Sequence, residues 1–92
     1  MGRVRGREMV RRLSQYQLLK LSENSHKGGW IDESLEWLLT RLLDEVQELK
    51  AEIRAPYRDP ELIARECADV ANFAGMILDV AMRGSREKNN NT

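Results

Sequence analysis

Several features that would restrict the function of this 92-residue sequence are scarce or missing. A single cysteine, Cys67, cannot form an intrachain disulfide, so we expect a reducing, cytoplasmic environment. No apolar run approaches the ~20 residues that span a bilayer, and the arginine-rich start lacks the apolar segment of a secretion signal. Acidic and basic residues balance at 15 each. Net charge therefore gives no general attraction to nucleic acid or to a membrane.

Apolar residues recur at helical spacing in three segments, and no segment alternates as a strand would. We expect helices over about 8–24, 33–54 and 60–83. The glycines at 28 and 29 should end the first, Asp32 should cap the second, and Pro56 should stop it. Asp59 and Pro60 should start the third, and Gly84 should end it.

The predicted fold class is therefore all-α, with antiparallel helices forming a bundle. We assign residues 8–84 to one domain and expect residues 1–7 and 85–92 to be flexible termini. So short a helical chain can leave apolar surface uncovered, and association is the common remedy. We therefore expect the bundle to be completed by homo-oligomerisation, as a homodimer or a homotetramer.

Four acids stand in two pairs, Glu45 with Glu48 and Glu66 with Asp69. Each pair is spaced i, i+3 within a predicted helix, so both acids of a pair share one helical face. The 17 residues between the pairs allow one helix to end and the next to return beside it. Four converging carboxylates repel one another unless a cation lies between them, and hard divalent cations are the usual answer.

Glu66 is the most unusual of the four, because it falls inside the apolar arc of its helix, between Val70 and Phe73. A buried carboxylate is costly unless it is paired or binds a cation. One explanation is a salt bridge to Arg41 or Lys20, and the other is a metal ion. The oxygen-rich ligand set, with one histidine and one cysteine in the whole chain, favours Mg²⁺ over zinc, with Mn²⁺ as a substitute.

The acid pairs lie within longer sequence motifs. These are Lys20-Leu21, Asn24, His26-Lys27-Gly28-Gly29-Trp30, Leu43-Asp44-Glu45-Val46-Gln47-Glu48-Leu49 and Glu66-Cys67-Ala68-Asp69-Val70-Ala71-Asn72-Phe73. Together they resemble the signature of the MazG-like, all-α nucleoside triphosphate pyrophosphohydrolases over roughly residues 15–83. The resemblance implies an enzyme that cleaves a (d)NTP into a (d)NMP and pyrophosphate, as in the housecleaning of nucleotide pools. It also implies that Glu45, Glu48, Glu66 and Asp69 are the catalytic, magnesium-binding acids.

Four further residues are candidates for substrate binding, each with a plainer alternative. Lys27 could meet a phosphate or be solvated, and Trp30 could stack on a nucleobase. His26 could contact base or phosphate, although a lone histidine is weak evidence. Asn72 could hydrogen-bond the substrate or lie on the polar surface. Trp37 is expected to pack between helices instead.

The sequence also allows two other functions. A non-catalytic, homo-oligomeric helical module would use the same acids and arginines to set helix pairing and register. A nucleic-acid binder would use the arginine-rich start, but no aromatic interleaving or reading motif supports it.

Overall fold

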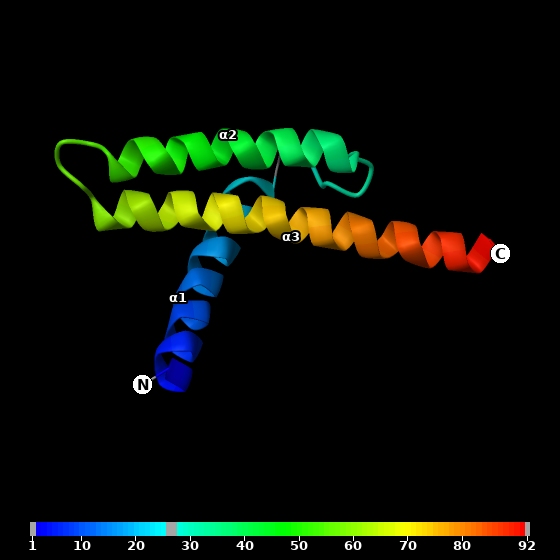
Figure 1. Cartoon of the computed structure of the whole chain (residues 1–92), viewed down its shortest axis with the longest axis horizontal. Coiled ribbons are helices and arrows are strands. Elements are labelled where there is room, and N and C mark those ends of the chain that lie inside the picture. Colours follow the sequence, from blue (N-terminus) through cyan, green and yellow to red (C-terminus); the bar gives the residue numbers. More distant parts are fainter. Residues whose placement is uncertain (1, 26–27, 92) are drawn as a thin grey trace.

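The computed structural model describes the backbone of residues 2–25 and 28–91 and the side chains of 4–25 and 28–83. It consists of three helices, α1 (Gly2–Glu23), α2 (Leu35–Ile53) and α3 (Pro60–Asn91) (Figure 1). No strand occurs among these residues. The all-α prediction is confirmed, and none of the described helices is long and apolar enough to cross a membrane.

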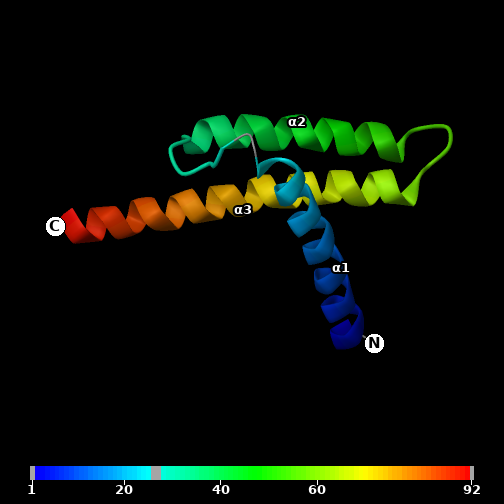
Figure 2. The ribbon, with the colours of Figure 1, turned by 180° about the vertical axis from the view of Figure 1, so that it is seen from behind.

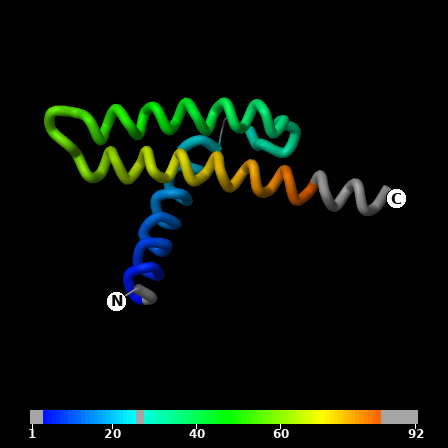
Figure 3. Tube along the Cα trace, in the orientation of Figure 1, coloured from blue at the N-terminus to red at the C-terminus, as the bar shows by residue number. Residues whose placement is uncertain are grey.

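α2 and α3 lie side by side and antiparallel, and the loop of residues 54–59 joins their adjacent ends (Figure 3). α1 packs against α3, crosses it steeply and points away from the pair (Figures 1 and 2). Within the described part of the chain, α1 makes no contact with α2. The protomer is therefore an antiparallel pair with one crossing helix, and completion of a bundle by a further copy stays a prediction.

The start of α2 differs from the prediction. Ser34, not Asp32, is the N-cap, because its hydroxyl accepts a hydrogen bond from the backbone N–H of Trp37 at 3.0 Å. The Glu33 N–H donates to the Trp30 carbonyl at 3.0 Å. Asp32 thus lies inside a turn, and the chain reaches helical geometry only after it.

The start of α3 agrees with the prediction. The Asp59 carboxylate accepts from the Glu61 backbone N–H at 2.9 Å, and Pro60 is the first helical residue. The predicted stop at Gly84 is wrong, because the helical backbone continues to Asn91. α1 likewise begins at Gly2 instead of residue 8. A glycine within a helix costs only about 1 kcal/mol, so it does not by itself end one.

The core between the helices is small and partly polar. Leu38 and Ala68 are the buried apolar residues among those described. The other two buried residues are Glu45 and Asn72, each only 7% exposed. A carboxylate and an amide therefore occupy buried positions at which apolar side chains would usually stabilise the fold more.

Candidate functional site

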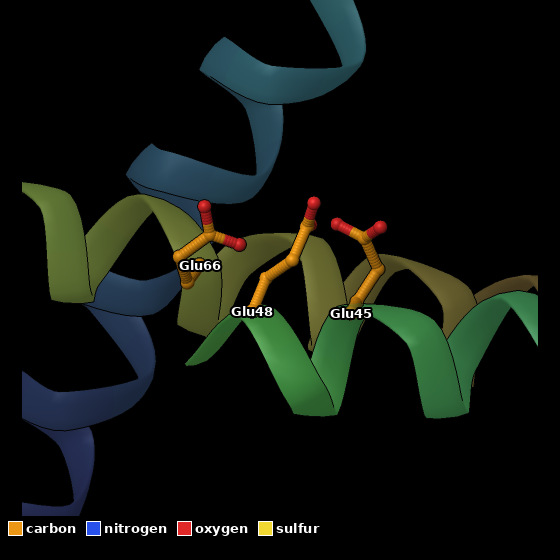
Figure 4. Close-up of side chains that lie close together, drawn as sticks. All are labelled: Glu45, Glu48 and Glu66. Atoms are coloured by element: carbon orange, nitrogen blue, oxygen red, sulfur yellow. The ribbon is translucent and has the colours of Figure 1, made fainter. Parts of the chain in front are cut away.

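Three of the four predicted acids converge. Glu45 and Glu48 come from α2 and Glu66 from α3, and one carboxylate oxygen of each lies within 4.8 Å of the other two. Figure 4 shows the three carboxyl groups extending to the same side of the antiparallel pair. The i, i+3 spacing aligns the two α2 acids, and the packing of α3 on α2 brings the third. We call these residues the glutamate cluster.

Glu66 has no partner that would explain its position. Its Oε2 atom is buried without a hydrogen bond, and no salt bridge reaches it among the described side chains. The bases suggested for it are engaged elsewhere. Lys20 lies 3.5 Å from Asp69, and Arg41 binds Glu45 at 3.4 Å and Asp44 at 2.9 Å. The salt-bridge explanation for Glu66 therefore fails.

Burial and repulsion between carboxylates make Glu45 and Glu66 hard to ionise. Burial, the neighbouring Glu48 and the charge of Asp69 raise the pKa of Glu45 to about 7, against the opposing effect of Arg41. Burial also raises the pKa of Glu66, with added repulsion from Glu48 and Asp69. Arg41 and Lys20 oppose these rises only in part, and a bound divalent cation would offset the remaining negative charge.

Asp69, the fourth predicted acid, is placed differently. Its carboxylate faces Lys20 of α1 and lies outside the group of three that approach within 4.8 Å. Burial raises the pKa of Asp69, and the Lys20 ammonium opposes that rise. Asp69 stands beside the cluster, and its role as a fourth metal ligand stays a prediction.

A pocket of about 520 Å³ opens next to the cluster, and Glu45 belongs to both. Charged groups at its wall are Lys20, Arg41, Glu45 and Asp69. Its apolar wall consists of Leu21, Trp30, Trp37, Phe73 and Met76. The guanidinium of Arg41 lies 5.2 Å from the centre of the Phe73 ring, which fixes a cation at the junction of the two walls. Such a pocket suits a ligand with one flat apolar part and one charged part.

The two tryptophans of the pocket differ in how their side chains are held. The Trp30 indole N–H donates to Asp79 of α3 at 2.8 Å, and that carboxylate also binds Arg83 at 2.9 Å. Trp37 is 46% exposed and lines the pocket, so the prediction that it packs between helices is wrong. It stands in the first turn of α2, across the pocket from Lys20 and Leu21 of α1.

Asn72 lines the pocket but is bound to α1. Its Oδ1 accepts from the Gln17 side chain at 3.0 Å, and its amide donates to the Gln17 carbonyl at 3.2 Å. The exposed polar position considered for Asn72 is wrong, because the residue is buried. The substrate contact stays a prediction. The clearest role of Asn72 is to hold α1 on α3.

The remaining predicted residues, His26 and Lys27, lie outside the described residues. Their neighbours Ser25, Gly28 and Gly29 line the pocket. Sequence reasoning missed Lys20 and Arg41 as pocket cations, since it considered them only as partners for Glu66. It also missed Asp79, whose one sequence signal is an acid near the end of an otherwise apolar helical run.

Comparisons of this chain with protein-family models, with curated proteins and with solved structures find no match. The resemblance to MazG-like enzymes therefore stays a prediction, and the function has to be argued from the site.

Proposed function

We propose that this protein is a Mg²⁺-dependent nucleoside triphosphate pyrophosphohydrolase that converts a (d)NTP to a (d)NMP and pyrophosphate. The observation that carries the proposal is the glutamate cluster with the unpartnered, buried Oε2 of Glu66. The cluster adjoins, through Glu45, a pocket with two cations and an aromatic wall. The reaction type comes from the resemblance of the acid pairs and their flanking motifs to MazG-like enzymes.

The donor set fits Mg²⁺. Glu45, Glu48 and Glu66 offer only carboxylate oxygens, which Mg²⁺ and Mn²⁺ prefer, and three such charges leave room for water and phosphate oxygens. These three residues would hold the ion, and Asp69 is the proposed fourth acid. When bound, the ion would offset the charge of the phosphates and lower the pKa of a coordinated water.

The protein's own groups account for substrate binding in this proposal. Lys20 and Arg41 would neutralise the triphosphate, and Trp30 and Trp37 would contact the base with their indole faces. A carboxylate of the cluster would accept a proton from water as its oxygen bonds to the α-phosphorus. The bond from that phosphorus to the bridging oxygen would break, and pyrophosphate would leave with the electron pair.

The test is pyrophosphate release from a panel of canonical and modified triphosphates in the presence of Mg²⁺. Glu66→Gln should lower kcat by at least ~100-fold, the scale of an essential acid–base group, while circular dichroism shows an unchanged fold. Glu8→Gln, an exposed acid on α1, is the matched control and should leave kcat unchanged. Full activity of Glu66→Gln would refute the proposal.

A second candidate, a non-catalytic homo-oligomeric helical module, is favoured by the exposed apolar side chains. Leu39, Leu43, Leu62 and Leu78 are 42%, 55%, 44% and 63% exposed. Thermal melts separate the two candidates. A nucleotide with Mg²⁺ should raise the Tm of the enzyme by binding its folded state, whereas the module should show no shift.

A further inference from the structure

α2 carries an apolar stripe that the protomer does not cover. Leu39, Leu43, Val46 and Ile53 are 42%, 55%, 37% and 41% exposed, and Lys50 completes their spacing of four and three residues. This spacing is the a/d pattern of helices that pair side by side. α2 contacts α3 alone among the described elements, so the stripe, residues 39, 43, 46, 50 and 53, is open to a partner.

A hollow of about 300 Å³ lies on the same stripe, lined by Val46, Leu49, Lys50 and Ile53 together with Arg54. The first four stand at i, i+3, i+4 and i+7. These are the four positions that surround one inserted side chain when two helices pack knobs-into-holes. The hollow is therefore placed to receive an apolar side chain from a facing helix.

We propose that α2 of a second copy packs antiparallel on this stripe, with Leu39 of each copy entering the hollow of the other. A two-fold axis between residues 44 and 45 relates the two copies. It places Leu43 beside Val46 of the second copy and Leu39 beside Lys50 of the second copy. Both the inserted side chain and its hollow lie on one helix, so two identical chains satisfy each other, as a two-fold interface requires.

Charge selects the antiparallel orientation. In a parallel pair, Lys50 would face Lys50 of the second copy within the seam, which like charges disfavour. In the antiparallel pair the Lys50 stem covers Leu39 of the second copy. Its ammonium then lies within about one turn of Glu36 of the second copy, an exposed acid. Two symmetric opposite-charge contacts replace one repulsion.

The small core also favours a second copy as the partner of the α2 stripe. Only Leu38 and Ala68 are buried apolar residues among those described, which is little for a chain of this length. Pairing through the stripe would bury four further apolar side chains per copy. This proposal rests on the α2 surface alone and is independent of any enzymatic activity.

The first experiment measures the mass of the full chain by sedimentation between about 1 and 100 μM, a range that brackets modest interface affinities. The wild type should be dimeric, and Leu39→Glu should raise the dimer Kd at least 100-fold. Leu62→Glu changes a residue of matched exposure on α3, 44% against 42%, and should leave the Kd unchanged. A monomeric wild type, or dissociation by Leu62→Glu alone, would overturn the proposal.

Disulfide cross-linking tests the register even if Leu39→Glu fails to fold. In a Cys67→Ala background, the double variant Leu43→Cys/Val46→Cys should form covalent dimers on oxidation. The single variant Leu39→Cys should not, because antiparallel packing separates the two copies of residue 39 by roughly 16 Å along the axis, beyond disulfide reach. Efficient cross-linking through Leu39→Cys would show that the two α2 helices pair in parallel. A chain that stays monomeric and binds an unrelated helix would refute the proposal that a second copy covers the stripe.

Discussion

The indole Nε1 of Trp30 donates a hydrogen bond to Oδ2 of Asp79 at 2.8 Å, across 49 residues of sequence. The bond ties the loop that follows α1 to the middle of α3 and sets one wall of the pocket. Arg83 binds the same oxygen at 2.9 Å and helps to hold the carboxylate in place. Asp79 itself does not line the pocket, so it acts by positioning Trp30.

Replacing Asp79 should therefore weaken substrate binding more than catalysis. Asp79→Ala removes one charge-assisted hydrogen bond, worth about 1.5–3 kcal/mol, and frees the indole. We expect the KM for a hydrolysed triphosphate to rise about 10-fold or more while kcat changes less than threefold. Steady-state kinetics measure both. Asp79→Asn, which keeps an acceptor oxygen, is the control and should resemble the wild type; an unchanged KM in Asp79→Ala would contradict the assigned role.

The stability of the metal-free protein should fall as pH rises from about 5 to 7. The pKa of Glu45 is about 7 in the folded chain and 4.5 as its ordinary value, so in this window the folded state binds more protons than the unfolded state. Raising the pH removes these protons and lowers the free energy of unfolding, by up to about 3 kcal/mol. Urea denaturation in a chelator at pH 5, 6, 7 and 8 measures the trend.

Two further measurements identify the group that causes this pH dependence of stability. Glu45→Gln cannot ionise and should flatten most of the pH dependence. Mg²⁺ favours the ionised carboxylates, so it should stabilise the wild type more at pH 8 than at pH 5. A metal-free protein whose stability rises steadily from pH 5 to 7 would show that Glu45 is not the dominant titrating group.

Asn72→Ala should affect stability before it affects chemistry. The substitution removes both hydrogen bonds to Gln17 and leaves part-buried polar groups of that residue without partners. We expect the free energy of unfolding to drop by about 1–3 kcal/mol, with kcat lowered less than threefold at temperatures well below the Tm. A double-mutant cycle with Gln17→Ala checks the pairing. A large loss of kcat in a fully folded Asn72→Ala protein would instead favour the predicted substrate contact.

Local signals made the helices of this chain predictable to different degrees. Apolar periodicity located all three, and Asp59 with Pro60 identified the start of α3 because a cap and a fixed backbone angle act on neighbouring residues. The same kind of signal misplaced the start of α2 at Asp32. The turn that holds Asp32 depends on a hydrogen bond between Trp30 and Glu33, and several nearby polar residues could have served equally as the cap.

The candidate site divides in the same way. The sequence by itself determined that Glu45 and Glu48 share a face and that Glu66 sits in an apolar arc, since helical spacing fixes both. Only the tertiary structure decided that the Glu66 carboxylate lies beside those of the two α2 acids, while the Asp69 carboxylate pairs with Lys20. That choice depends on the register of α3 against α2 and on the crossing of α1. Both result from packing between segments far apart in the chain, which no local pattern encodes.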